Sequence, residues 1–423
     1  MLIRWIKRLR NMFTSVKRAR PVAPAWAEVV VAATNLTLPL DVNDPSREPR
    51  SSAARIGAIS LAAFALPGLM ITSAQAEAAP EDGVISLKYQ TYRDSQPGLD
   101  RIRVNAPALH VFAPIAGSWS VEASTVQDNI SGASPRWHTS ISGASKMEDR
   151  RTAADVKLTK YFERASVGMR FAYSDEHDYR SNAVALDGRF SSADNNTTWF
   201  AGISTSRDTI NPVNGIVENE HKNVSEFMVG VTQAWTKNDL LQFNLTYVRG
   251  NGYFNDPYKL VDQRPREKNQ TTAMLRWNHF VESNSTTIRS SYRYYSDSFG
   301  VRAHTLSGEW VIPVAERFSI TPSARYYSQR AASFYFDPVY DPVIGEPYPV
   351  GAPKFYSADT RLSSYGGITV GGKIEWRYDK NWSFDVKYER YEQRSSWRLD
   401  GGGSPGLAPF RAQFAQIGVS RRF

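Results

Sequence analysis

The stretch DLLQFNLTYVR, residues 239–249, alternates apolar and polar side chains. Leu241, Phe243, Leu245 and Tyr247 share one parity, and polar residues separate them. Successive side chains of a β-strand point to opposite faces, so this stretch predicts a strand with one apolar and one polar face. The same period recurs from residue 84 to the last residue, and no stretch has sustained helical spacing of apolar residues.

The alternating segments are separated by connections of two kinds. Short turns such as Thr236-Lys237-Asn238 follow the even segments, whereas long loops such as 250–268 and 329–361 follow most odd ones. We predict sixteen strands: 84–93, 101–113, 117–127, 151–162, 166–175, 181–191, 197–207, 223–235, 239–249, 269–280, 285–297, 301–313, 317–328, 362–377, 381–392 and 410–423. The two weakest are 101–113, which Pro107 interrupts, and 181–191. If these two segments are not strands, the number of strands is fourteen.

An even strand count with short and long connections in alternation is typical of outer-membrane barrels. A sheet crosses lipid only if it closes, because an open edge leaves backbone groups unpaired in hydrocarbon. We therefore predict an all-β, antiparallel up-and-down transmembrane barrel, with interfacial aromatics such as Tyr92, Tyr247 and Trp277. The chain ends on Phe423, a terminal aromatic that predicts recognition by the barrel-assembly machinery. Outer-membrane lipid is the other expected partner.

The first 76 residues predict a leader. Ile56–Ile71 is an apolar stretch after Arg50 and Arg55, and it is followed by Ala74-Gln75-Ala76, a small-x-small cleavage site. We predict cleavage after Ala76, export, and a single barrel over 77–423. The preceding fifty residues are long for a signal peptide. Either the positive region is extended or translation starts further downstream, near Val29.

Charge and composition exclude several classes of protein. Residues 1–76 hold ten of the 51 Lys and Arg and four of the 42 Asp and Glu, so 77–423 carries 41 basic and 38 acidic residues, net +3. The net charge of +9 therefore belongs mainly to the leader and gives little support to nucleic-acid binding. The absence of cysteine excludes disulfides and thiolate metal sites.

Charged residues on the polar parity predict the lumen lining, because a charge on the lipid face is costly. We expect Arg276, Arg293 and Arg325 to form a row that sets ionic selectivity in a channel for a small polar or ionic solute. The alternative is a lattice of cross-strand salt bridges that fills the interior. Glu309, Lys373 and Glu375 belong to the same lining under both interpretations.

The loops give weaker signals. We expect the acids of 250–268 and 329–361 to be solvated, although the second loop is long enough to fold inward and narrow the lumen. The cluster Asp175-Glu176-His177-Asp178 predicts a solvated hairpin tip, with an outer-membrane hydrolase site as the weaker alternative. We predict no catalytic, cofactor or metal site, since the histidines lack ligand spacing and nucleophile and phosphate-loop motifs are missing. The expected role is not enzymatic.

Five segments of the mature chain stand out: DNISGASP (128–135), NGYFNDPYK (251–259), RPREK (264–268), SYRYYSDSF (291–299) and RYYSQ (325–329). They resemble segments of the domain-of-unknown-function family 3570, uncharacterised proteobacterial outer-membrane proteins. The resemblance implies a barrel but no established activity. Family members often lie beside genes for a small lipoprotein, a thioredoxin-like protein and a flavin transferase. This implies, as the alternative function, a scaffold for a lipoprotein or a periplasmic redox partner; the oligomeric state stays open.

Overall fold

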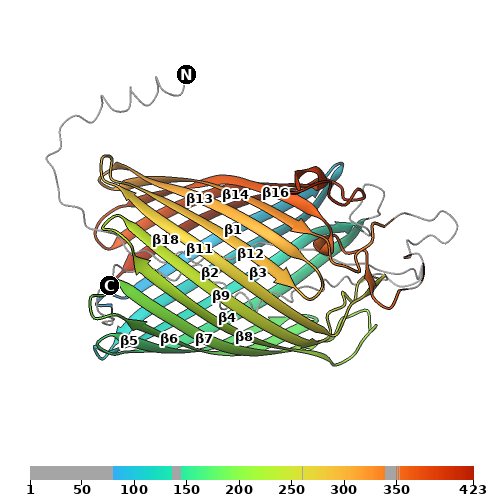
Figure 1. The fold of residues 1–423 in the computed structure, drawn as a ribbon, viewed down its shortest axis with the longest axis horizontal. Helices are drawn as coiled ribbons and strands as arrows, with labels where there is room; N and C mark the ends of the chain where they lie inside the picture. Colours follow the sequence, from blue (N-terminus) through green and yellow to red (C-terminus); the bar gives the residue numbers. More distant parts are fainter. Residues whose placement is uncertain (1–79, 136–143, 260, 339–348, 350, 352) are drawn as a thin grey trace, which may run out of the picture.

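A single closed barrel makes up most of the structure (Figure 1). The computed structural model describes residues 80–135, 144–259, 261–338, 349, 351 and 353–423, so the expected leader over 1–76 lies outside the described residues. The barrel strands are β1 (Val84–Gln96), β2 (Leu99–Ile115), β3 (Trp119–Pro135), β4 (Ala144–Tyr161), β5 (Ala165–Glu176), β6 (Tyr179–Ser191), β7 (Thr197–Ile210), β8 (Glu220–Ala234), β9 (Asp239–Gly252), β11 (Glu267–Val281), β12 (Thr286–Asp297), β13 (Arg302–Ala315), β14 (Phe318–Arg330), β16 (Tyr365–Arg377), β17 (Trp382–Arg394) and β18 (Phe410–Arg422).

Each strand pairs antiparallel with its neighbours along the chain, and β1 pairs with β18 to close the barrel. The prediction of sixteen strands is confirmed, which makes fourteen wrong. Pro107 lies within β2 and is paired with Tyr89 of β1. On the other side of β2, the pairing with β3 is interrupted between Asn105 and Ala108, so Pro107 has no partner on β3. Proline has no N–H to donate, so the strand continues with a local gap in one ladder.

The two ends of the barrel differ. One end, which we call the turn end, carries the C-terminus and short connections such as 162–164 and 316–317. The other, the loop end, carries the long connections to the right in Figure 1, with the described residues 211–219, 253–259, 261–266, 331–338, 353–364 and 395–409. The predicted alternation of short and long connections is therefore confirmed, apart from tight loop-end turns such as 177–178.

The outer wall is apolar and the inner wall is polar. Leu87, Phe243 and Val386 are 55%, 45% and 54% exposed on the outside. On the opposite parity, polar side chains such as Gln90 and Gln242 are buried. In a soluble protein the apolar side chains lie inside and the polar ones outside. Here the distribution is the reverse and matches that of membrane barrels, whose strands alternate apolar-out and polar-in. No helix among the described residues has the length and apolarity to cross a membrane.

Apolar packing inside the barrel gathers near the loop end. Tyr92, Ile102, Val104, Ile130 and Ala412 form one buried cluster there. Tyr92 is only 6% exposed, so the prediction that it lies at a membrane interface is wrong. It shares the inward parity of β1 with Gln90 and Asp94, which places the ring inside the barrel.

Two long loops meet in a second, smaller sheet. β10 (Asp262–Gln263), in the loop after β9, pairs antiparallel with β15 (Tyr356–Ser357), in the loop after β14. The 3-10 turn η1 (Thr360–Leu362) follows β15, and η2 (Ser395–Trp397) follows β17. These pieces connect loops that are distant in sequence across the loop end.

Candidate functional site

Three of the predicted lumen arginines lie on the inner face of neighbouring strands. Arg276 of β11 is opposite Ser291, Ser291 is opposite Ser307, and Ser307 is opposite Arg325 of β14. Arg293 of β12 lies on the same inward parity, two residues from Ser291. Within the described part of the chain, none of these arginines forms an ion pair, and Arg276 contacts the Gln242 side-chain oxygen at 3.4 Å.

A fourth arginine on the same wall has a carboxylate partner. Arg289 lies directly opposite Glu309, and their charged atoms are 3.7 Å apart. The two side chains are 47% and 39% exposed, so this wall faces open space inside the barrel. The inner surface of β11–β14, which we call the arginine wall, therefore carries Arg276, Arg289, Arg293 and Arg325 with Glu309 as a carboxylate among them.

The other predicted lumen residues are paired. Lys373 and Glu375 are neighbours along β16, with charged atoms 3.4 Å apart and both side chains 16% exposed. Lys387 and Glu389 pair in the same way on β17, at 3.2 Å. Charges of this part of the lining neutralise one another locally.

The opposite wall is tied together by ion pairs between strands. Arg170 of β5 contacts Asp155 of β4 and lies 3.2 Å from Glu122 of β3. Lys157 of β4 lies 2.6 Å from Asp187 of β6. The two arrangements that the sequence left open, an unpaired arginine row and a salt-bridge lattice, thus occur together on different walls.

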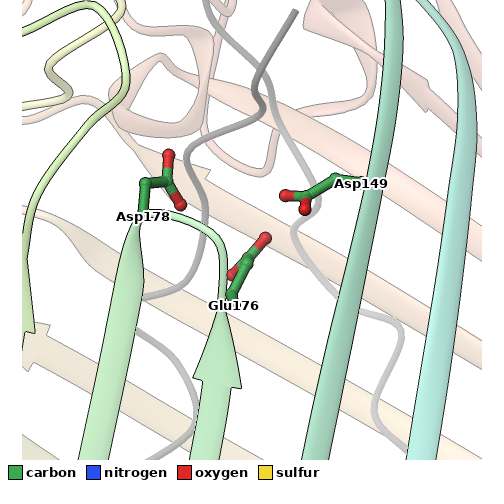
Figure 2. A group of neighbouring side chains, drawn as sticks. All are labelled: Asp149, Glu176 and Asp178. Atoms are coloured by element: carbon green, nitrogen blue, oxygen red, sulfur yellow. The ribbon is translucent and has the colours of Figure 1, made fainter.

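Three carboxylates face one another just inside the loop end. Asp149 at the start of β4, Glu176 at the end of β5 and Asp178 in the following turn each place an oxygen within 4.8 Å of the others (Figure 2). Glu176 and Asp178 are buried, so the predicted solvated tip is wrong for these two residues, while His177 is exposed as expected. Glu176 continues the inward parity of β5, whose buried residues are even-numbered, whereas the buried residues of β6 are odd-numbered, so the position of Asp178 is set by the turn.

Sequence reasoning missed Asp149, because it started the strand at residue 151. Extending the inward parity of Asp155 back along β4 would have reached it. The hydroxyl of Tyr258, in the loop after β9, donates to the Asp178 carboxylate at 2.6 Å and joins that loop to the cluster. Clustered acidic oxygens are ligands that hard cations prefer, but an acidic cluster does not by itself define a metal site.

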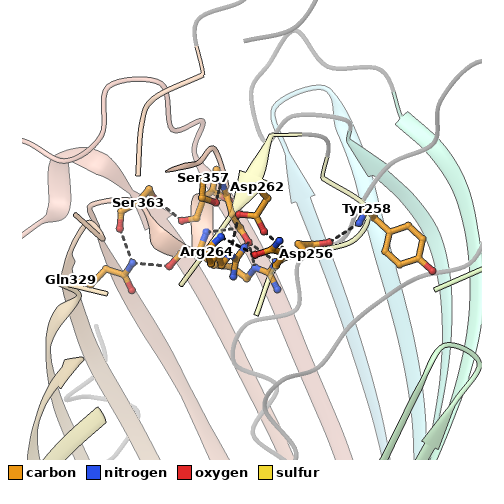
Figure 3. Close-up of polar contacts among 11 residues, drawn as sticks. Asp256, Tyr258, Asp262, Arg264, Gln329, Ser357 and Ser363 are labelled. Atoms are coloured by element: carbon orange, nitrogen blue, oxygen red, sulfur yellow. Dashed lines mark hydrogen bonds and ion pairs between the residues drawn. The ribbon is translucent and has the colours of Figure 1, made fainter. Parts of the chain in front are cut away.

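A second charged cluster lies between the loops 253–266 and 331–364 (Figure 3). Arg264 lies 2.9 Å from Asp262 and 2.6 Å from Asp359, and Arg361 contacts both Asp359 and Asp256. We call Asp256, Lys259, Asp262, Arg264, Asp359 and Arg361 the loop clamp. Asp256, Lys259, Asp262 and Asp359 are all buried.

The prediction that these loop acids are solvated is therefore wrong. The pairing of β10 with β15 brings two loops together that are each polar in sequence, so their charges neutralise one another away from water. Burial by itself raises the pKa of Asp359, but the nearby cations, Arg361 first, hold that pKa well below its usual range. Burial raises the pKa of Asp262 and lowers the pKa of Lys259.

The described end of the loop 331–364 docks on the inner side of the barrel mouth. The Gln329 amide donates to the backbone oxygens of Arg361 and Ser363, at 2.9 and 2.6 Å. Gln329 shares the inward parity of β14 with Arg325, so these bonds bring η1 against the inside of the barrel. Leu362 packs there on Phe299. Residues 339–348 of this loop lie outside the described residues.

A family model described as a protein of unknown function, DUF3570, matches residues 56–146, 139–218 and 215–414. The chain belongs to this family. Its matched segments include the arginine wall and the loop clamp, and they cover the five stretches that suggested the resemblance from sequence. No curated protein matches the chain significantly.

Solved barrels resemble this DUF3570 member distantly. A Pseudomonas aeruginosa FadL homologue is 12% identical, with 80% of this chain and 90% of that chain covered and a TM-score of 0.39. A mutant of the monoaromatic hydrocarbon channel TodX is 9% identical, with 82% and 91% covered and a TM-score of 0.41. A bacterial polysaccharide outer membrane secretin is 8% identical, with 81% and 98% covered and a TM-score of 0.45.

Proposed function

We propose that the protein is a non-enzymatic outer-membrane channel that passes small polar solutes and favours anions. The observation that supports this most directly is the arginine wall. Arg276, Arg293 and Arg325 face the inside of a closed barrel and form no ion pair within the described residues, while Arg289 is 47% exposed on the same wall. Charge that is neither neutralised nor buried acts on whatever enters the lumen.

The outer wall supports the membrane location. Rows of apolar side chains cross neighbouring strands in register, such as Phe384, Val419, Leu87 and Leu109 on β17, β18, β1 and β2. Burying such a surface in lipid is favourable, and closure of the barrel leaves no open sheet edge in the hydrocarbon. In this orientation the turn end with Phe423 faces the periplasm and the loop end faces outward. The signal peptide, the barrel-assembly machinery and outer-membrane lipid stay part of this proposal.

Anion preference follows from the charge balance of the arginine wall. Four guanidinium groups and the Glu309 carboxylate face the lumen over β11–β14, and rings of fixed positive charge favour anions in pores. The wall built on Arg170 and Lys157 is neutralised by its own ion pairs and adds little net field.

Conductance in planar bilayers tests the proposal. The purified exported chain is inserted between unequal KCl solutions, and the sign of the reversal potential reports the preferred ion. We expect ohmic channels with chloride preference in the wild type. The triple variant Arg276→Gln, Arg293→Gln, Arg325→Gln is expected to move the reversal potential toward zero or to cation preference.

The matched control is Arg249→Gln, which removes an exposed arginine on the outer face of β9. It should leave the reversal potential unchanged. A folded wild-type barrel that is electrically silent would overturn the channel function, and an unchanged potential in the triple variant would overturn the role of the arginine wall.

A scaffold is the second candidate function, because the guanidinium groups of the arginine wall offer a charged docking surface inside the barrel. In that role the barrel holds a lipoprotein or a periplasmic flavin- or thioredoxin-linked redox protein. Affinity purification of the chain from detergent-solubilised membranes would recover such a partner at near-equal amounts. Recovery of the barrel alone would count against the scaffold.

A further inference from the structure

Exposed arginines encircle the outer face of the barrel near the loop end. They occupy outward positions just beyond the apolar band, where Arg249 follows Tyr247 on β9 and Arg390 follows Tyr388 on β17. At this height a membrane presents its headgroups rather than its acyl chains. The exposed members are Arg93, Arg103, Arg150, Arg180, Arg207, Arg249, Arg302, Arg330, Arg390 and Arg411.

Three of these arginines lie in one row across β17, β18, β1 and β2, in which Gln413 occupies the β18 position. Arg390 is opposite Gln413, Gln413 is opposite Arg93, and Arg93 is opposite Arg103. We call these four residues the rim patch. Strands lie about 4.8 Å apart, so the patch spans roughly 14 Å. This width suits a headgroup that carries two phosphates.

The rim patch has uncompensated positive charge. Arg93 and Arg103 face each other across the strand pair, and like charges in directly opposed positions destabilise a sheet. Glu392, the outward carboxylate two positions from Arg390 on β17, is bound by Arg394 at 2.6 Å and by Arg411 at 3.4 Å. Within the described residues, no ion pair includes Arg93, Arg103 or Arg390, so the row lacks an anion.

Toward the turn end, the outer face becomes apolar two rows below the rim patch. The next outward row holds Tyr388, Ala415, Thr91 and Asn105. Below it lies a row of four apolar or aromatic residues, Val386, Ile417, Tyr89 and Pro107. A ligand on this face therefore meets cations at one end and hydrocarbon-compatible side chains at the other. Phosphate with attached acyl chains has the complementary arrangement.

We propose that the rim patch binds a phosphorylated lipid of the outer leaflet, with its phosphates between Arg390, Arg93 and Arg103 and its acyl chains along the apolar rows below. Arginine suits this role because its planar guanidinium donates two parallel hydrogen bonds to phosphate oxygens. The proposal rests on the membrane location proposed above, but not on conductance, because the patch lies on the outer face.

Native mass spectrometry of the detergent-purified full chain tests the proposal. The probes are diphosphorylated lipid A, its dephosphorylated form, and phosphatidylethanolamine. We expect the diphosphorylated lipid to be retained, and the triple variant Arg93→Gln, Arg103→Gln, Arg390→Gln to lower its apparent affinity about tenfold or more. The matched control Arg207→Gln, Arg249→Gln removes two outward arginines whose cross-strand neighbours are Asn and Ser, and it should bind like the wild type.

Two outcomes would overturn the proposal: equal retention of phosphorylated and dephosphorylated lipid A, or unchanged affinity in the folded triple variant. If the triple variant does not fold, the single variant Arg93→Gln decides. Without phosphorylated lipid it should be as stable as the wild type or more stable, because it relieves the opposition to Arg103. With the lipid it should be stabilised less than the wild type. Equal stabilisation of both proteins by the lipid would contradict the site, and neither result depends on whether the barrel conducts.

Discussion

Arg264 and Asp359 are 95 positions apart in sequence, yet a guanidinium nitrogen of the first lies 2.6 Å from a carboxylate oxygen of the second. The pair connects the loop after β9 to the loop after β14, across the hairpin of β12 and β13. Both side chains are largely buried, at 10% and 0% exposure. This contact makes the two loops one unit.

Replacing Arg264 by Met should separate the loop after β9 from the loop after β14, while the barrel stays closed. Breaking a buried ion pair from one side typically costs about 3–5 kcal/mol, because the remaining charge loses its partner. Hydrogen exchange should therefore accelerate in 253–266 and 353–364 but not in the barrel strands. The control is Arg266→Met, whose 62%-exposed side chain pairs with Glu220 and should matter by about 0–1 kcal/mol. Equal protection in the two variants would contradict a structural role for the clamp.

The pH dependence of the clamp follows from Asp359. Its pKa is held well below the usual value by its cations, so its ionised form stabilises the folded loops. That contribution is fully present above the unfolded pKa of about 3.9 and is lost only as pH falls through the lower folded pKa. Asp359→Asn should therefore lose loop protection at pH 7, and the gap from the wild type should close only in strong acid. A gap that closes near pH 6 would contradict this assignment.

Arg170 should be more important for barrel stability than Arg289. Arg170 is 10% exposed and serves two carboxylates, Asp155 and Glu122, whereas the pair of Arg289 and Glu309 is half exposed. We expect Arg170→Met to lower the free energy of unfolding by about 3–5 kcal/mol, and Arg289→Met to lower it by about 0–1 kcal/mol. Urea unfolding in lipid vesicles, followed by tryptophan fluorescence, measures both. Similar losses in the two variants would show that burial is not the deciding difference.

Phe423 should act in assembly rather than in the finished barrel. Its backbone exchanges two hydrogen bonds with Gly83, while its side chain is 60% exposed on the outside. Removing the ring therefore costs the folded barrel little contact. Phe423→Ala should reduce folded protein in the outer membrane of cells but refold normally from urea into detergent. A refolding defect as large as the cellular one would place the effect in the barrel itself.

The strands and their parity could be predicted because both follow from neighbouring residues. The alternation of apolar and polar residues in 239–249 is visible in the sequence itself. The same alternation in β11 and β14 places Arg276 and Arg325 on the inner face. Even Pro107 could be accommodated, because a single missing donor interrupts one ladder and not the strand.

The loop clamp and the acid cluster could not be predicted in this way. Asp262 and Asp359 meet through a pairing of two-residue strands, too short to leave a pattern in the sequence. Glu176 and Asp149 approach each other because β4 extends further than its apolar alternation shows. The clamp contact joins residues 95 positions apart, and the acid contact depends on where β4 begins beside β5, so the local pattern shows neither partner.

The loop clamp holds three acids and three bases, so it adds bulk at the mouth without adding net charge. On the same side of the barrel, the unpaired guanidinium groups of the arginine wall lie below the clamp. Arg325 lies four residues from Gln329, which is roughly 13 Å along β14 away from the mouth. In the proposed channel, the neutral clamp would therefore limit solute size at the mouth, and the arginine wall would select solute charge further along the lumen. A substitution in the loop clamp would then change the size limit without changing the charge preference, and a substitution in the arginine wall would do the reverse.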